Sequence, residues 1–260
     1  MNKTVLITGP TSGIGYELAK CFARDGYGLV LVARSGDRLS LLKDEFEKKY
    51  GVFVKTIEKD LSKPDAPKEI FQELKKDAHP IDILVNNAGF GNYGTFYNTD
   101  LQAELQMIQL NMTSLTHLTK LFLTDMVKNT WGRILNVAST AAFQPGPLMA
   151  VYYASKAYVL SFSEALASEL EGTGVTVTAL CPGPTRTDFQ KRAEIEGTRL
   201  VNGGLMMDSV IVAKEGYLGL MKGKTVVIPG FKNKAIAFLV RFTPRNLVTK
   251  IVRRIQEDKK

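Results

Sequence analysis

The sequence predicts an α/β protein whose parallel sheet is covered by helices on both faces. Short apolar runs rich in Val, Ile and Leu alternate with longer segments of helical periodicity along 260 residues. The runs indicate buried strands, because strands covered on both faces are apolar throughout. A glycine-rich turn joins the first strand to the first helix. Strands that alternate with helices in this way favour a doubly wound parallel sheet.

The elements follow one another without a repeat or a low-complexity linker, which predicts a single domain over residues 1–260. The expected strands are residues 3–8, 28–33, 52–57, 81–85, 134–138, 175–180 and 225–228. The first expected helix follows the glycine-rich turn and ends near residue 25, and the second starts near residue 36. The others cover about 64–77, 99–109, 111–128 and 151–171.

Composition limits the classes of function. The hydrophobic fraction of 45% suits a large core, and the only histidines are His79 and His117, so we expect no metal site and no His-based triad. Cys21 and Cys181 lack the spacing of metal ligands, and we expect two buried thiols. We see no signal peptide pattern and no apolar run of the ~18 residues that span a bilayer. These features predict a cytoplasmic protein.

The glycine-rich turn reads Thr8-Gly9-Pro10-Thr11-Ser12-Gly13-Ile14-Gly15. Glycines let the backbone approach a pyrophosphate, and the helix that follows offers free N–H donors and the positive end of its dipole. A strand, such a turn and a helix are typical of the start of a Rossmann-like dinucleotide fold. The alternative is an ordinary strand-to-helix turn.

The end of the second strand predicts which dinucleotide binds. An enzyme that uses NAD typically places a carboxylate there, about 20 residues beyond the turn, to hold the ribose hydroxyls. This strand ends in Ala33 and is followed by Arg34, whose guanidinium suits phosphate oxygens. Ser12 and Arg38 could add contacts. We therefore predict NADP(H), with NAD as the alternative.

A candidate catalytic pair lies on the expected helix 151–171. Tyr152 and Lys156 are four residues apart, which places both side chains on one helix face. A nearby ammonium favours the phenolate and lowers a pKa that starts at about 10, so such a phenol can exchange protons near neutral pH. Tyr153 lacks this spacing and is expected to face away. A solvated lysine beside a packed tyrosine is the alternative.

Several polar or glycine-containing segments end predicted strands, where open α/β sheets bind ligands. They are the glycine turn, Arg34, Asp60, residues 86–89, Ser139 and Pro182-Gly183.

With these motifs in order and in register, the chain resembles the short-chain dehydrogenase/reductase family over nearly its full length, most closely bacterial oxidoreductases of undefined substrate. The matching residues are Thr8 to Gly15, Asn86 to Gly89, Asn111, Ser139, Tyr152, Lys156, Pro182, Gly183 and Thr185.

The resemblance implies roles for these residues. Tyr152 would exchange a proton with the substrate oxygen, and Ser139 would stabilise charge on that oxygen. Lys156 would bind the nicotinamide ribose and lower the Tyr152 pKa, and Asn111 would hold a water of the proton relay. The cofactor would contact Gly9, Thr11, Ser12, Gly13, Ile14, Gly15, Arg34, Asp60, Leu61, Asn87, Ala88, Gly89, Tyr152, Lys156, Pro182, Gly183 and Thr185.

The predicted function is therefore interconversion of a carbonyl and a secondary alcohol. A dinucleotide-sensing regulator or scaffold without turnover is the alternative. The resemblance also implies a homodimer or homotetramer. Asn86, Gly89 and Asn111 could instead be purely structural.

The resemblance also implies that residues 186–210 form a substrate lid. Its apolar residues would suit an apolar substrate, with packing onto the domain as the alternative: Leu200, Val201, Leu205, Met206 and Met207. Phe90, Tyr93, Phe143, Pro145 and Met149 are expected to wall the same pocket.

A basic helical tail is expected over about 231–260. Residues 222–260 hold 11 basic and 2 acidic residues, whereas the other 221 residues hold 23 basic and 24 acidic ones. Within the tail, Leu247, Val248, Ile251, Val252 and Ile255 form one apolar stripe. We expect this stripe to pack on a subunit or on the domain, with peripheral contact to an anionic membrane as the alternative. Nucleic-acid binding is not expected, because interleaved aromatic residues and a binding motif are missing.

Overall fold

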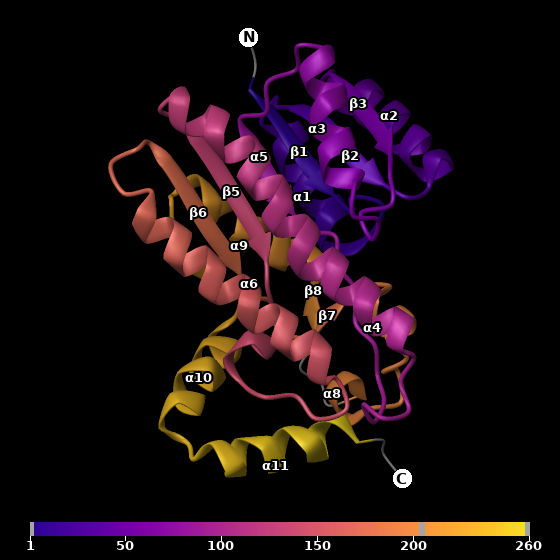
Figure 1. Cartoon of the computed structure of the whole chain (residues 1–260), viewed down its shortest axis with the longest axis vertical. Coiled ribbons are helices and arrows are strands. Elements are labelled where there is room, and N and C mark those ends of the chain that lie inside the picture. Colours follow the sequence, from indigo (N-terminus) through magenta and orange to yellow (C-terminus); the bar gives the residue numbers. More distant parts are fainter. Residues whose placement is uncertain (1–2, 203–205, 258–260) are drawn as a thin grey trace.

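The computed structural model describes residues 3–202 and 206–257, and this part of the chain forms a seven-stranded parallel sheet. The strand order is β3-β2-β1-β4-β5-β6-β9, which confirms the predicted Rossmann-like class (Figure 1). The strands are β1 Thr4–Thr8, β2 Gly28–Ala33, β3 Val54–Glu58, β4 Ile83–Asn86, β5 Gly132–Val137, β6 Val175–Leu180 and β9 Val226–Val227. The order reverses direction beside β1, so the loops after β1 and β4 open a crevice between them.

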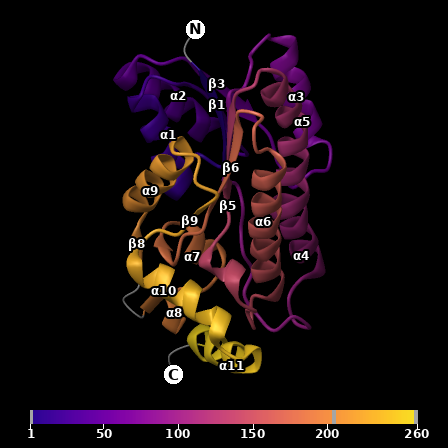
Figure 2. The ribbon, with the colours of Figure 1, turned by 90° about the vertical axis from the view of Figure 1, so that its left-hand side faces the viewer.

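Helices cover both faces of the sheet (Figure 2). One layer holds α1 Gly13–Arg24, α2 Gly36–Tyr50 and α9 Ser209–Met221, and the other holds α3 Ala66–Lys76, α5 Leu115–Lys128 and α6 Ala150–Glu169. Alternate side chains of each strand enter one layer or the other: Val5 and Ile7 of β1 join the first core, and Leu6 joins the second.

The two helices expected over 99–109 and 111–128 are one continuous helical run, so the break predicted near residue 110 was wrong. α4 Leu101–Ile108 passes through a π-helical stretch, η1 Gln109–Ser114, into α5. Each π-helical turn takes up an additional residue and is common at functional sites. Asn111 lies inside this stretch.

The predicted lid and tail lie together at one end of the molecule (Figures 1 and 2). The lid contains α7 Phe189–Arg192, α8 Arg199–Asn202 and a small sheet that pairs β7 Thr185–Arg186 with β8 Met207–Asp208. The tail contains α10 Phe231–Leu239, a short turn η3 Val240–Phe242 and α11 Arg245–Gln256. None of the described helices is long and apolar enough to cross a membrane.

Candidate active site

A cavity of about 830 Å³ opens at the carboxyl ends of the strands. It runs from the turn after β1 to the lid, and its volume suits a cofactor with a small substrate. Every predicted site residue except Asn111 lines it: Gly9, Thr11, Ser12, Gly13, Ile14, Gly15, Arg34, Asp60, Leu61, Asn87, Ala88, Gly89, Ser139, Tyr152, Lys156, Pro182, Gly183 and Thr185.

The glycine turn forms a cradle that side chains would fill. Gly9 has a φ of 65°, which favours glycine. A Cβ on Gly15 would lie 2.3 Å from the Gly9 carbonyl oxygen, so only glycine fits there. The Asn87 Nδ2 donates to the carbonyl oxygens of Thr8 and Gly9, both at 2.9 Å. The loop after β4 thus holds the turn after β1 in shape.

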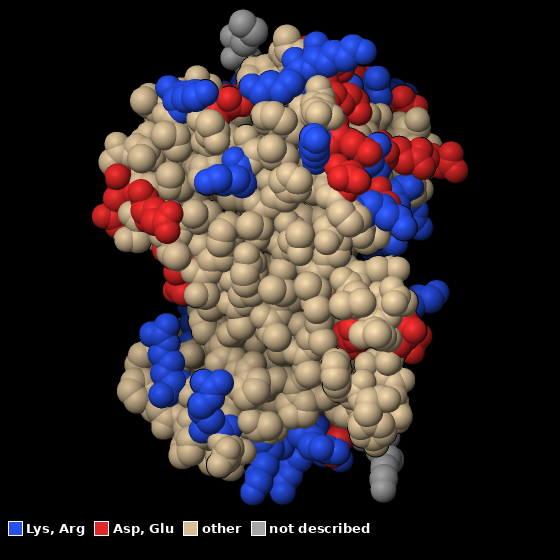
Figure 3. Space-filling view, in the orientation of Figure 1, with Lys and Arg blue, Asp and Glu red and all other residues tan. Residues whose placement is uncertain are grey.

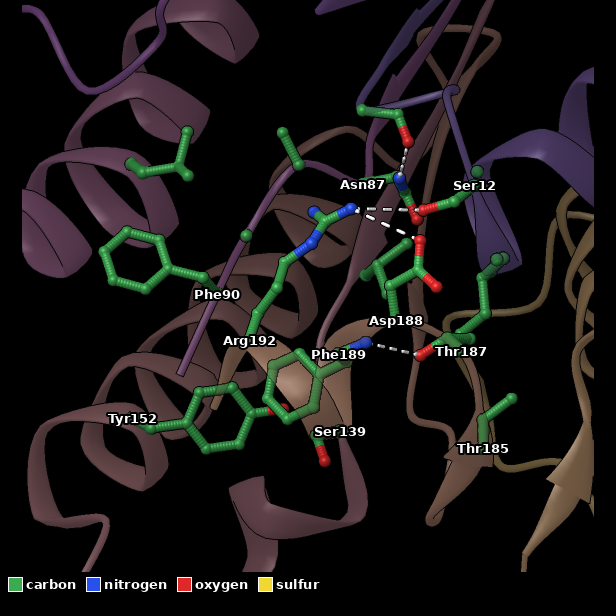
Figure 4. Close-up of a pocket in the computed structure, with 18 of the residues that line it drawn as sticks. Ser12, Asn87, Phe90, Ser139, Tyr152, Thr185, Thr187, Asp188, Phe189 and Arg192 are labelled. Carbon is green, nitrogen blue, oxygen red and sulfur yellow. Dashed lines mark hydrogen bonds and ion pairs between the residues drawn. The ribbon is translucent and has the colours of Figure 1, made fainter. Parts of the chain in front are cut away.

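This cradle fits a pyrophosphate. α1 begins at the cavity, and its first N–H groups have no partner inside the helix; the Ser12 side chain does not cap them. Arg192 of α7 reaches across to the same turn, with Nη2 at 3.4 Å from Ser12 Oγ and 3.6 Å from Asp188 Oδ2 (Figure 4). A helix N-terminus with an arginine beside it favours anions.

The part of the cavity beside the ends of β2 and β3 carries two arginines and one acid. Arg34 and Arg38 line the cavity with exposed side chains, and neither forms a salt bridge with any residue in the described ranges. Asp60 Oδ1 accepts from the backbone and hydroxyl of Ser62, at 3.0 and 2.8 Å. Burial opposes ionisation of Asp60, but these hydrogen bonds and the Arg34 charge together lower its pKa.

Ser139 follows β5 and faces Tyr152 across the cavity (Figure 4). It caps a 3₁₀ turn, η2 Thr140–Phe143: its Oγ accepts from the Ala141 N–H at 3.1 Å and donates to the Pro182 carbonyl at 3.4 Å. Tyr152 lies in the first turn of α6. Burial raises the pKa of Tyr152 to about 12, while a hydrogen bond with Ser139 acts to lower it.

Lys156 lies one turn further along α6 and is buried. Its Nζ donates to the Val137 carbonyl at 2.8 Å and lies 5.7 Å from the centroid of the Tyr152 ring. Burial lowers the pKa of Lys156 to about 8. The expected lowering of the Tyr152 pKa is therefore wrong for this structure, because burial dominates and the opposing contribution comes from the Ser139 hydrogen bond. The Lys156 ammonium donates to the Val137 carbonyl instead.

Asn111 has a bracing position behind the cavity. It is buried, its Oδ1 accepts from the Phe90 N–H at 3.2 Å, and its Nδ2 donates to the Phe90 carbonyl at 3.0 Å and to Ser155 Oγ at 3.1 Å. The side chain thus fixes the loop after β4 to α6, the helix that carries Tyr152. Asn86 is also structural, because its Nδ2 donates to Thr119 Oγ1 and Asn136 Oδ1.

The far end of the cavity is apolar. Of the predicted pocket residues, Phe90, Met149 and Val201 line it. Tyr93, Phe143 and Pro145 do not line it, nor do Met206 and Met207; Leu205 and the side chain of Leu200 lie outside what the structure describes.

Tyr153 was predicted to face away from the site, and this prediction was wrong for its ring. Its ring borders the cavity, while its hydroxyl accepts from Gln256 Nε2 of α11 at 2.7 Å. The Gln256 carbonyl in turn accepts from the Tyr93 hydroxyl at 2.8 Å. The last helix is therefore fastened to the wall of the cavity.

The lining residues that sequence reasoning did not single out include Phe189, Arg192, Thr187 and Ile195. The Phe189 and Tyr152 ring centroids are 5.3 Å apart. Only one signal pointed to them, which was their position in the expected lid. Their spacing in the sequence carries no motif, because a short loop helix brings them to the site.

Comparisons with known proteins show the family of this chain. The family model described as short chain dehydrogenase matches residues 3–196. A ketoacyl reductase of a Nostoc species is 31% identical over 246 residues, which cover 93% of this chain and 79% of that protein. A 3-oxoacyl-[acyl-carrier-protein] reductase of Aquifex aeolicus is 33% identical over 187 residues, 72% of this chain and 75% of that protein. Some relatives are matched less fully, down to 61% of their length.

Solved structures share the fold over nearly the whole chain. A short-chain dehydrogenase from Sphingobium yanoikuyae in complex with NADPH is 35% identical, with a TM-score of 0.84 and 94% of each chain covered. An alcohol dehydrogenase from Comamonas testosteroni, described as specific for bulky-bulky ketones, is 30% identical, with a TM-score of 0.78 and 92% of each chain covered.

Proposed function

Because this chain belongs to the short-chain dehydrogenase/reductase family, we propose that it is an NADP(H)-dependent oxidoreductase that interconverts a carbonyl group and a secondary alcohol. The observation that carries the proposal is the convergence of Ser139, Tyr152 and Lys156 in one cavity with a glycine cradle at its other end. A cavity with these parts can hold a dinucleotide and place a carbonyl beside a proton donor.

The residues fit NADP(H). The Gly9–Gly15 cradle and Arg192 would hold the pyrophosphate, and Arg34 with Arg38 would meet the 2′-phosphate. Pro182 to Thr185 would close on the nicotinamide end. When bound, the cofactor supplies or takes the hydride. NAD is the alternative cofactor.

Residues of the chain would donate the proton to the substrate oxygen in reduction and accept it in oxidation. Tyr152 is the proposed general acid in reduction and the base in oxidation, with Ser139 as the donor that steadies charge on the substrate oxygen. Burial raises the pKa of Tyr152 to about 12, so the phenol holds at neutral pH the proton that a reduction would take up. Lys156 and Asn111 would position this pair and the cofactor ribose.

The substrate is proposed to be apolar. Phe90, Met149, Phe189, Ile195 and Val201 wall the end of the cavity beyond Tyr152. Burial of such a wall against a hydrocarbon chain or ring is favourable. A ketone with a large apolar substituent therefore fits better than a small sugar. A homodimer or homotetramer stays part of this proposal.

The alternative is a dinucleotide sensor without turnover, since the cradle alone would bind NADP(H). A panel of carbonyl compounds, followed by cofactor absorbance with NADPH and with NADH, separates the two. We expect NADPH oxidation with bulky apolar ketones. Tight NADPH binding without turnover across the panel would instead favour the sensor.

A further inference from the structure

The C-terminal face of the molecule, formed by the outer side of α10, η3 and α11, combines exposed apolar side chains with basic ones. The apolar side chains include aromatic ones: Phe231, Ile236, Phe238, Leu239, Phe242, Leu247, Ile251 and Ile255, each between 40% and 84% exposed. The basic side chains are Lys232, Lys234, Arg241, Arg245, Lys250, Arg253 and Arg254, all exposed. Lys and Arg gather at this end of the molecule in Figure 3.

Helix α11 has two rows of residues at four-residue spacing, and only one of them is buried. Val248, Val252 and Gln256 recur at four-residue spacing and are buried against the molecule. Leu247, Ile251 and Ile255 form a second row at the same spacing, and are 49%, 45% and 40% exposed. The tail stripe predicted to need burial thus divides into one buried row and one row that is 40% to 49% exposed.

Basic residues border the exposed row. At 100° per residue, Lys250 and Arg254 fall on the side of Leu247 and Ile251 that is opposite to the buried row. α10 and η3 continue the same composition: Phe238 and Phe242 are 58% and 73% exposed, with ring centroids 5.1 Å apart. Exposed apolar rows flanked by Lys and Arg are typical of helices that lie in a membrane interface.

A second exposed apolar patch lacks this charge pattern. Phe96, Tyr97, Leu101 and Leu105 are 48% to 85% exposed around the start of α4. Residues 91–108 contain no Lys or Arg but include Asp100 and Glu104. Between the two patches, only the C-terminal face complements a negatively charged surface.

We propose that the C-terminal face docks on the surface of a membrane that contains anionic lipid, with the exposed apolar row and phenylalanines inserted among the headgroups. Lys and Arg near such a surface gain from its negative potential, and the apolar side chains gain from leaving water.

The docking helix α11 packs directly behind the apolar end of the cavity. A second step of the proposal follows from this contact, and it rests on the proposed function. Val248 and Val252 pack in one cluster with Met149, Tyr153 and Ile195. Gln256 fastens the same helix to Tyr153. A docked enzyme would therefore place the apolar end of its cavity next to the lipid, and apolar substrate would enter from there.

Flotation of the purified full-length chain with vesicles tests the docking and needs neither cofactor nor turnover. We expect binding to phosphatidylcholine vesicles that contain phosphatidylglycerol, weaker binding at high salt, and little binding to phosphatidylcholine alone. Lys250→Glu with Arg254→Glu should lower the partition coefficient at least about tenfold. Lys48→Glu with Lys68→Glu makes the same charge change on α2 and α3 and should bind like wild type.

The apolar part of the face has its own pair of variants. Leu247→Gln with Ile251→Gln changes only the exposed row and should also weaken flotation, whereas Leu101→Gln with Leu105→Gln on α4 should not. Thermal unfolding checks that each variant is folded. Failure of wild type to float at low salt would overturn the proposal. So would a Leu247→Gln, Ile251→Gln variant that floats normally but loses subunit mass in sedimentation, because the face would then cover a second copy.

Activity provides the readout for the second step. Vesicles should raise kcat/KM for a long-chain ketone in wild type, and should not do so in Lys250→Glu with Arg254→Glu. If wild type floats but vesicles do not raise its kcat/KM, the proposed substrate entry from the lipid is wrong and the docking face is retained. A protein that floats and turns over no ketone contradicts the proposed function instead.

Discussion

The two ends of the cavity are built in different ways. The cofactor end is built around backbone at strand ends, including a glycine turn whose Thr8 and Gly9 carbonyls accept from the Asn87 side chain. At the substrate end side chains from segments far apart in sequence meet, as Gln256 does with Tyr153, 103 residues away. Backbone at strand ends is positioned by the sheet itself, whereas the substrate end depends on where a lid and a tail settle. The geometry of the cofactor end is therefore set by the fold, whereas the geometry of the substrate end is set by the lid and tail of this particular chain.

The largest expected effect lies where the two ends meet. Tyr152→Phe keeps the ring but removes the proton, so turnover should fall by at least about 10². The Kd for NADPH should stay near that of wild type, because the cofactor end is untouched. Stopped-flow turnover and fluorescence titration measure the two quantities.

Tyr153→Phe is the matched control, since it removes the neighbouring hydroxyl. Its kcat should stay within a few-fold of wild type. Equal losses of kcat in both variants would show that the proton role is misassigned.

A change confined to the cofactor end should alter cofactor choice alone. Arg34→Ala removes a charge-assisted phosphate contact of about 1.5–3 kcal/mol, so the ratio of kcat/KM for NADPH over NADH should fall roughly ten- to a hundred-fold. KM for the ketone should hardly move. An unchanged ratio, or a wild type that prefers NADH, would refute the role of Arg34.

The buried Lys156, which lies where the two ends of the cavity meet, should make the stability of the protein depend on pH. Burial lowers the pKa of Lys156 to about 8, against an ordinary value of 10.5. Below pH 8 both the folded and the unfolded chain hold the proton, and the buried charge lowers the free energy of unfolding. Between these two pKa values the unfolded chain binds more protons, so stability from this group rises with pH.

The free energy of unfolding of Lys156→Met should therefore exceed that of wild type at pH 7 by about 1–3 kcal/mol. Loss of the hydrogen bond to the Val137 carbonyl reduces this gain. This gain should shrink as the pH rises through 8 to 10. Urea unfolding of both proteins across that range provides the measurement. A gain that stays constant with pH would mean that Lys156 titrates normally.

The smallest effect is expected at the substrate end. Gln256→Ala removes the donor to the Tyr153 hydroxyl, which should lower the free energy of unfolding by about 1 kcal/mol. The loss is limited because the Gln256 Oε1 is itself buried without a partner among the described residues. KM for a bulky ketone should rise while KM for NADPH does not.

Arg253→Ala on the same helix is the control, since its exposed ion pair with Glu257 contributes little. Parallel changes in both KM values of Gln256→Ala would show that the two ends are not independent.

The same division explains what could be predicted from the sequence. The sheet, its parallel order and the glycine cradle follow from local signals, such as apolar runs and a turn where only Gly15 fits. Residues expected at strand ends, such as Asp60 and Ser139, do line the cavity. The continuous run through η1 was missed, because the additional residue of a π-helical turn shifts the apolar periodicity and so resembles a break between two helices.

Other features depend on tertiary packing. The direction of the Tyr152 pKa shift was mispredicted. The spacing shows that Lys156 is near, but not that burial dominates or that the Lys156 ammonium donates a hydrogen bond to the Val137 carbonyl. The position of Arg192 depends on how a four-residue helix, α7, folds over the glycine turn. Such contacts have no periodicity that a sequence could reveal.

The attachment of α11 to Tyr153 has a consequence for how this family diversifies. The family model ends at residue 196, whereas Val201, Val248 and Gln256 help to form the substrate wall and its backing. Under the proposed function, exchange of the C-terminal segment alone should change which substrates fit and leave cofactor binding and the proton donor as they were. A substrate name is safely inherited only between relatives whose similarity continues into the last helix.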